Sequence, residues 1–417
     1  MPKVDARDCP ITGASPRALE HFECALAAFQ LARGDPLAHL CDAIADAPEF
    51  AMARIAEAYL RLGGRDPGGV DGAAHILGDI TPGRLNSRER GHFAALAAAV
   101  AGEYEAASGL LASVLREHPR DALALQVAHS FDYVRGDAHA LRIRVEAVLP
   151  AWSAEIPGYH AVLAMHAFGL EECGEYGRAE EVALHALELE PRNVRAHHAV
   201  AHVLEMQGRS QEGERWMRSR ASHWADGGPM TLHHWWHLAL FQLEAEGGQR
   251  ALETYDQRIG PGADAISDLI DASALLWRLH LRGMDLAGRW RSLAGRWAPH
   301  AGDAYCAFSD LHAMMAFAGA QRWDLAQVLL AAQSRRILQG GSNSDMTRLV
   351  GLPACRALQA FGRGDYATAE DLLSRLPPLA HRVGGSQAQR DVLGLTCTAA
   401  RHLLAARRPS RERLRAA

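Results

Sequence analysis

The feature that most restricts the fold is a spacing of small residues that recurs along the chain. The segment from Arg88 has alanine at its position 8, glycine at 15, tyrosine at 17, alanine at 20 and proline at 32. The segment from His160 repeats all five, and the segment from Val350 repeats the first four. Glycine permits the turn that ends one helix, and alanine lets two helices cross closely. Each segment is therefore predicted to form a helix–turn–helix unit.

This spacing is that of the tetratricopeptide repeat, whose period is 34 residues. Hydrophobic residues make up 48% of the chain, and no stretch alternates as a strand would. We therefore predict an all-α fold, a tetratricopeptide-like α-solenoid or superhelix of roughly ten helix–turn–helix units. A single domain, 1–417, is expected, with an N-terminal extension (1–19), N-terminal repeats (20–153), central repeats (154–260), C-terminal repeats (261–405) and a basic tail (406–417).

Composition excludes several classes of function. A formal net charge of −5 argues against a nucleic-acid partner, and no apolar run is long enough to suggest a membrane protein. Lys3 is the only lysine, so neither a P-loop nucleotide site nor a pyridoxal phosphate (PLP) Schiff base is expected. The arginine bias is typical of a GC-rich bacterial genome. Seven scattered cysteines without a CxxC pair indicate free thiols and a cytoplasmic location.

Histidine and tryptophan are concentrated between positions 195 and 244, which hold seven histidines and four tryptophans. Apolar residues recur there at helical spacing on both sides of a connector, so two helices are expected. His198, His202 and Glu205 lie at i, i+4 and i+7 and share one stripe of the first helix. His234 and His237 lie at i and i+3 on the second.

The repeat register predicts which side chains point inward. In tetratricopeptide folds, positions 2, 5, 9 and 12 of the first helix line the concave face. Glycine occupies position 15 in four successive alignments, at Gly102, Gly174, Gly208 and Gly247. The last two alignments aim these residues inward: Arg195, His198, His202, Glu205, His234, His237, Phe241 and Glu244. Trp236 and His197 fall in packing positions, and His233 is expected to be a packing histidine.

Three interpretations of the stripe remain open. His198, His202 and Glu205 have a spacing compatible with a divalent metal site of two histidines and one carboxylate, with His234 or His237 as further ligands. The same residues suit a metal-free site for a polar ligand or for catalysis. They also suit structural hydrogen bonds between neighbouring helices.

Further inward candidates lie later in the chain: Asp271, Trp277, Asp310 and His312. Arg390 and Asp391 follow a glycine turn that suits an anionic group.

Several stretches resemble the tetratricopeptide repeat protein 38 family. They are AHHAVAHVLEMQGR, HHWWHLALF, Tyr255–Asp256, IDASALLWRL, Arg289–Trp290, DLHAMMAF and GGSQAQRDV. The resemblance covers essentially the whole chain and implies a cytoplasmic tetratricopeptide-like superhelix, but no settled reaction. The family's matching positions are His198, His202, Glu205, His234, Trp236, His237, Asp271, Trp277, His312, Arg390 and Asp391.

Two classes of function follow. In the favoured class, the inner face encloses a small-molecule pocket lined by histidine, glutamate, tryptophan and arginine, where hydrolase- or lyase-type acid–base chemistry is conceivable. His202 or His237 would be the base, with His198 beside them, Glu205 the acid or orienting group and Arg390 the anion clamp. Phe241 would add an apolar wall. In the other class, the protein is a scaffold whose groove binds a peptide or protein partner.

Overall fold

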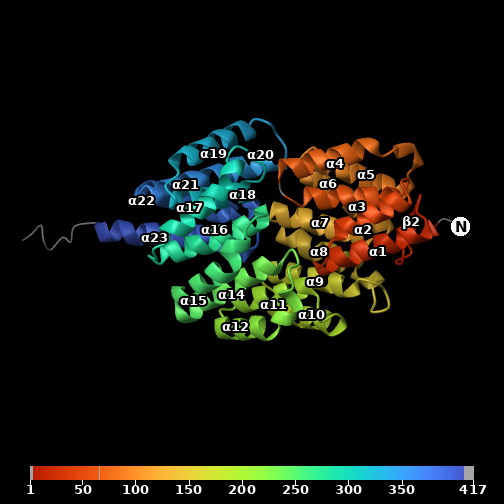
Figure 1. Ribbon diagram of the computed structural model, residues 1–417, viewed down its shortest axis with the longest axis horizontal. Helices are drawn as coiled ribbons and strands as arrows, with labels where there is room; N and C mark the ends of the chain where they lie inside the picture. The colour runs from red at the N-terminus through yellow and green to blue at the C-terminus, as the bar shows by residue number, and fades with distance from the viewer. Residues whose placement is uncertain (1–2, 65, 408–417) are drawn as a thin grey trace, which may run out of the picture. The chain divides into compact units, whose positions relative to one another are not determined.

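The computed structural model describes residues 3–64 and 66–407, and these residues form an almost entirely α-helical structure (Figure 1). The prediction of an all-α helical array is therefore confirmed. The contacts divide the chain into two units, Met1–Gly247 and Gly248–Ala417. Each unit is described separately below.

The first unit begins with the short antiparallel strands β1 (Lys3–Val4) and β2 (Pro10–Ile11), which the sequence did not predict. Its helices follow in order: α1 (Pro16–Leu31), α2 (Pro36–Asp46), α3 (Ala51–Leu62), α4 (Pro67–Asp79), α5 (Ser87–Val100), α6 (Tyr104–Glu117), α7 (Ala122–Arg135), α8 (Ala138–Val148), α9 (Tyr159–Glu172), α10 (Tyr176–Leu189), α11 (Val194–Met206), α12 (Ser210–Ser219), α13 (Ala221–Trp224) and α14 (Thr231–Glu246). Short 3-10 turns, η1 (Pro82–Arg84) and η2 (Leu149–Ala151), join two of the pairs.

Consecutive helices of the first unit pack as hairpins, and the first helix of one hairpin contacts the first helix of the next, as α9 does α11 (Figure 1). The predicted turn glycines end α5, α9 and α11 with positive φ: Gly102 at 80°, Gly174 at 80° and Gly208 at 68°. A residue with a Cβ would be strained in this left-handed conformation. The glycine spacing in the sequence therefore marks real helix ends.

The end of α1 crosses to helices much later in the chain. The carbonyl oxygen of Phe29 accepts a hydrogen bond from Gln126 of α7 at 3.2 Å, and Arg195 of α11 lies 3.4 Å from it. Arg33 donates to the carbonyl of His223 at 2.8 Å and forms an ion pair with Asp226. The end of the first helix is thus held against α7, α11 and the segment after α13.

The N-terminal residues are an integral part of this unit. The hydroxyl of Thr12 donates to Glu89 Oε2 at 2.6 Å, and Arg88 Nη1 lies 3.3 Å from Asp5 Oδ2. Arg88 also reaches Asp121 at the start of α7. The predicted N-terminal extension therefore packs on α5 through buried polar contacts.

The second unit contains α15 (Gly248–Thr254), α16 (Ile266–Leu281), α17 (Ala287–Trp297), α18 (Ala307–Gly319), α19 (Trp323–Arg336), α20 (Ser342–Met346), α21 (Leu352–Gly362), α22 (Tyr366–Ser374) and α23 (Gln387–Arg407). The π-turns η3 (Tyr255–Ile259) and η6 (Thr347–Gly351) and the 3-10 turns η4 (Gly260–Gly262), η5 (Ala298–His300) and η7 (Pro377–Val383) complete it. Helix α16 packs against both α18 and α23, and α21 joins α18 to α23. These four helices surround a common core. Most of the predicted basic tail, from 408 on, lies outside the described residues.

In the described part of the chain, no helix is both long and apolar enough to cross a membrane. The seven cysteines are free thiols.

A buried carboxyl in the second unit gives this unit a pH-dependent stability. Asp310 is 5% exposed and accepts a hydrogen bond from Gln333 at 3.0 Å. Burial raises the pKa of Asp310 from 3.8 to about 7, although the Gln333 hydrogen bond opposes the shift. The folded protein therefore binds a proton that the unfolded chain releases above pH 3.8. The resulting stabilisation is complete below that pH and is lost as pH rises towards 7.

We expect Asp310→Asn to remove this loss, because an amide has no charge to bury and Gln333 can turn its carbonyl oxygen towards it. At pH 8 the variant should be more stable than the wild type by up to roughly 4 kcal/mol, with little difference at pH 4. Urea unfolding at both pH values measures this. An equal pH dependence in the two proteins would contradict it.

Candidate functional site

Four histidines converge between α11 and α14 in the first unit. His198 and His202 are four residues apart on α11, and His233 and His237 are four apart on α14, so each pair shares one helix face. One ring nitrogen from each of the four lies within 4.8 Å of all the others. His198 Nε2 is 2.9 Å from His233 Nε2 and 3.0 Å from His202 Nε2. We call these residues the four-histidine cluster.

Aromatic side chains hold the rings of the cluster. Phe168 of α9 stacks on His198 with ring centroids 5.6 Å apart and meets His202 edge-on at 5.3 Å. Trp236 stacks on His233 at 5.2 Å with an interplanar angle of 12°. Because aromatic neighbours pack against these rings, the ring nitrogens have little freedom to turn away from one another.

Two of the rings, His202 and His237, have a carboxylate beside the Nδ1 nitrogen. His237 Nδ1 lies 2.9 Å from Glu205 Oε2, a hydrogen bond that places the Nδ1 proton towards the carboxylate and leaves the lone pair on Nε2. His202 Nδ1 lies 3.5 Å from Glu171 Oε2, long for a hydrogen bond but close for an ion pair. Both Glu171 and His202 are fully buried. Among the described residues, neither oxygen of Glu171 has a hydrogen-bond partner.

The pKa values of the two histidines of α11 are shifted in opposite directions. Burial lowers the pKa of His198 well below 6.5, and the neighbouring histidine rings lower it further. Burial also acts to lower the pKa of His202, but Glu171, with Glu205 and Glu172, outweighs it and raises that pKa. His198 is therefore neutral and offers a lone pair, whereas the buried carboxylates near His202 favour positive charge at this point.

The distances suit a tetrahedral metal ion. Zinc binds imidazole nitrogen at about 2.0–2.1 Å, so the nitrogens of a tetrahedral site are about 3.4 Å apart. The two short separations in the cluster, 2.9 and 3.0 Å, and the upper limit of 4.8 Å bracket that value. His202 and His237 are fully buried, whereas His198 and His233 are partly exposed and mark the side that water can reach.

The structure exchanges the expected positions of His233 and His234. Predicted to point inward, His234 is fully buried and its ring nitrogens face the backbone carbonyls of Met230 at 2.9 Å and Val194 at 3.2 Å. Burial lowers its pKa to about 3. His233, expected to be packing, belongs to the cluster. On a helix both 233 and 234 lie near the face of His237, so only the crossing of α14 over α11 decides between them.

Other predicted residues of the first unit lie in the core. Phe241 is 1% exposed, and its ring fills the space that a Cβ on Gly213 of α12 would occupy, at 2.4 Å. The expectation that Phe241 lines a pocket is therefore wrong, because Gly213 lets α12 approach α14 closely enough to enclose the ring. Trp236 is fully buried and takes the packing position that the register predicted.

The predicted residues of the second unit are described by their own contacts. Trp277 is fully buried and donates its indole N–H to Thr396 Oγ1 at 2.9 Å, and His312 Nδ1 lies 2.8 Å from the carbonyl of Phe308. Asp271 is 3% exposed on α16. Asp391 pairs with Arg278, and Arg390 donates to the carbonyl of Gly385.

Sequence reasoning treated His233 as a packing histidine, and it placed Glu171 on the concave face by register without giving it a role; both had a signal. His233-x3-His237 repeats the spacing of His198-x3-His202. Glu171 occupies the same register position as Glu205, one hairpin earlier. No family model matches the chain.

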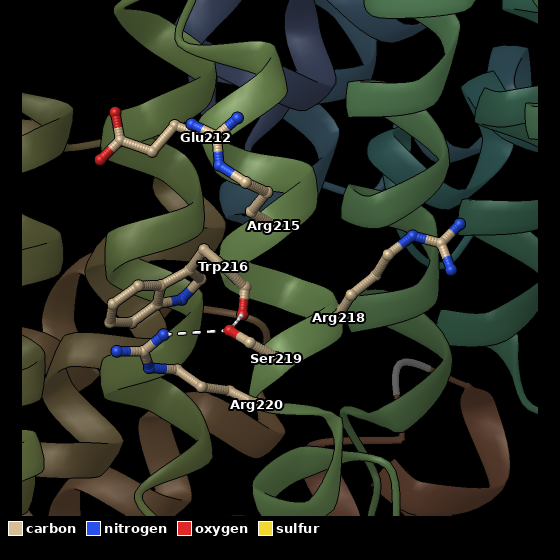
Figure 2. Close-up of a pocket in the computed structure, with 6 residues that line it drawn as sticks. All are labelled: Glu212, Arg215, Trp216, Arg218, Ser219 and Arg220. Atoms are coloured by element: carbon tan, nitrogen blue, oxygen red, sulfur yellow. Dashed lines mark hydrogen bonds between the residues drawn. The ribbon is translucent and has the colours of Figure 1, made fainter.

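A shallow depression lies elsewhere in this unit, along α12 (Figure 2). It is lined by Glu212, Arg215, Trp216, Arg218, Ser219 and Arg220. The guanidinium of Arg220 lies 3.6 Å above the Trp216 ring, and Arg218 pairs with Glu214 at 2.8 Å. Arg218 and Arg220 are thus engaged by neighbours on the same segment and do not converge on one point as the histidines of the four-histidine cluster do.

Proposed function

We propose that the first unit carries a metal centre in which His198, His202, His233 and His237 hold one divalent transition-metal ion. The observation that supports this is the convergence of four ring nitrogens while carboxylates lie at the opposite nitrogens of His202 and His237. A carboxylate at the far nitrogen is the usual partner of a metal-binding histidine, because it orients the ring and raises its basicity. Imidazole ligands suit zinc, copper, iron and nickel.

Charge balance also supports a cation at this point. Glu171 is a fully buried carboxylate whose only ion-pair partner among the described residues is His202. A buried charge without full compensation is costly. A divalent cation on the Nε2 side of His202 and His237 would offset the charge of Glu171 and Glu205 through the two rings.

The reaction we propose is metal-assisted hydrolysis or lyase chemistry on a small molecule. Catalytic zinc sites use three protein ligands and keep one position for water, whose pKa the metal lowers to about 7. His198, His202 and His237 would hold such an ion, which would supply a bound water of lowered pKa. His233 is partly exposed and would be available as the base for a proton of that water.

The scaffold alternative receives less support. The end of α1 lies against α7, α11 and the segment after α13, so this chain already fills part of the groove that a peptide would need.

We also propose that the array is of tetratricopeptide type and that the chain belongs to the tetratricopeptide repeat protein 38 family. The glycine turns at the repeat spacing and the motifs quoted above support this assignment. A cytoplasmic location is proposed because the seven thiols are free.

Cobalt titration tests the metal centre. Chelator-treated protein is expected to bind one equivalent of Co²⁺ per chain with the visible absorption of four-coordinate cobalt, and zinc should displace it. Four-coordinate geometry is expected because the cluster supplies four nitrogens that all lie within 4.8 Å of one another. An octahedral, weakly absorbing cobalt spectrum or the absence of saturable binding would overturn the proposal. The absence of binding would return the site to metal-free acid–base chemistry by His202 with Glu171.

A further inference from the structure

One arginine stands next to the four-histidine cluster without a carboxylate partner. Arg195 is in the first turn of α11, three residues before His198, so the two side chains share a helix face with Cβ atoms about 5–6 Å apart. No described carboxylate oxygen lies within ion-pair distance of its guanidinium, although 49 aspartates and glutamates are present in the chain. Its nearest polar contact is the carbonyl oxygen of Phe29, at 3.4 Å.

The contact with Phe29 does not account for this charge. That carbonyl oxygen already accepts hydrogen bonds from the amide of Ala32 at 3.3 Å and from Gln126 at 3.2 Å. Its two lone pairs are thus engaged, and the guanidinium is a distant third donor. Arg195 Nε is enclosed and has no hydrogen-bond partner among the described residues. The residue as a whole is of intermediate exposure.

The surroundings of Arg195 supply polar groups but no negative charge. The ring of Phe29 lies 5.9 Å from the guanidinium carbon. Burial lowers the pKa of Arg195 to about 10, which agrees with a cation that lacks a counter-ion. Two amides at the same end of α1 also have buried atoms without hydrogen-bond partners in the described structure, Gln30 Nε2 and Gln126 Oε1. A group with several oxygens would accept hydrogen bonds from the guanidinium of Arg195.

We propose that Arg195 binds a carboxylate or phosphate group of the small molecule on which the metal centre acts. This inference rests on the proposed function and adds the class of substrate: an anion that places its oxyanion on Arg195 and its reacting part near His198. A planar guanidinium matches such a group with two parallel hydrogen bonds. The positive charge of the metal would favour the same class of ligand.

Phosphate and acetate binding to zinc-loaded protein tests the inference. Affinity is measured from the thermal stabilisation by inorganic phosphate, and separately by acetate, at constant ionic strength. Losing a hydrogen bond to a charged group costs enough to weaken binding about tenfold or more, so Arg195→Gln is expected to show this loss. Arg192→Gln removes an exposed arginine three residues earlier and should bind like the wild type. The anion that binds the wild-type protein more tightly identifies the preferred group.

Zinc content measured on the same samples separates the two proposals. Equal anion affinity in Arg195→Gln and the wild type, with zinc bound in both, would overturn the anion site alone. In that case Arg195 would have only a structural role, through its contact with the end of α1. Absence of zinc from the wild type, with anion binding that still requires Arg195, would overturn the metal function alone. Should Arg195→Gln fail to fold by circular dichroism, Arg195→Lys replaces it: affinity equal to the wild type would contradict a bidentate contact.

Discussion

The double replacement His198→Ala/His202→Ala is expected to abolish stoichiometric metal binding. It removes both ligands that α11 contributes, so the ion would keep only His233 and His237 and would exchange with solvent. Four-ligand zinc sites bind with an apparent free energy of roughly 10–16 kcal/mol, and losing half of the ligands should weaken binding on the order of 10³-fold or more. Metal analysis by mass spectrometry after dialysis against a weak chelator measures the loss.

A matched control removes two histidines away from the cluster. His75 and His185 are exposed, with side-chain exposures of 82% and 51%, and His75→Ala/His185→Ala should keep full metal content. Far-UV circular dichroism of both double variants separates metal loss from unfolding, because His202 is buried and its removal leaves a cavity. Full metal content in the folded His198→Ala/His202→Ala protein would contradict the assignment of the ligands.

Replacing Asp121 is expected to have the largest effect on stability. Asp121 is fully buried, 2.5 Å from Arg88 Nε and 2.9 Å from His92 Nε2, and its other oxygen caps the start of α7. Burial alone would raise the pKa of Asp121, but Arg88 and then His92 outweigh it and hold that pKa well below 3.8. Asp121→Asn keeps the cap and leaves Arg88 buried beside Asp5 alone, at a cost of roughly 3–5 kcal/mol.

Urea unfolding followed by circular dichroism measures this effect, and its pH dependence adds a second readout. Because the folded pKa of Asp121 is depressed, its contribution is present above pH 3.8 and is lost as pH falls towards the folded value. Asp121→Asn should therefore lose part of the acid sensitivity of the wild type. Asp137, which caps α8 from a more exposed position, is the control: Asp137→Asn should cost less than about 1 kcal/mol. Similar losses in both variants would contradict the buried ion-pair account.

Local signals in the sequence predicted most of the helices. Glycine at position 15 of each unit ends a helix wherever it was assigned, because the left-handed backbone at Gly102, Gly174 and Gly208 is a local property of the residue. The histidines of α11 were also predicted correctly as one stripe, since the spacing of four residues on a helix decides this without any neighbour. The packing position of Trp236 follows from the same register.

The features that the sequence did not predict share a physical cause. His233 and Phe241 depend on how α14 crosses α11 and α12, and a rotation of less than one residue step decides which neighbour faces the partner helix. The pairing of Asp391 with Arg278 joins residues 113 positions apart, which no local pattern encodes. The strands β1 and β2 are two residues long, too short for an alternating pattern.

The sequence by itself determined the helical class, many of the helix ends and the shared stripe of His198 and His202, because these follow from backbone preferences and from spacing within one helix. Only the tertiary structure decided that two His-x3-His pairs meet, that Glu171 lies behind His202, and that the end of α1 reaches Arg195. Each of these contacts joins different helices. Their geometry depends on the crossing angles, which the packing of the whole unit sets.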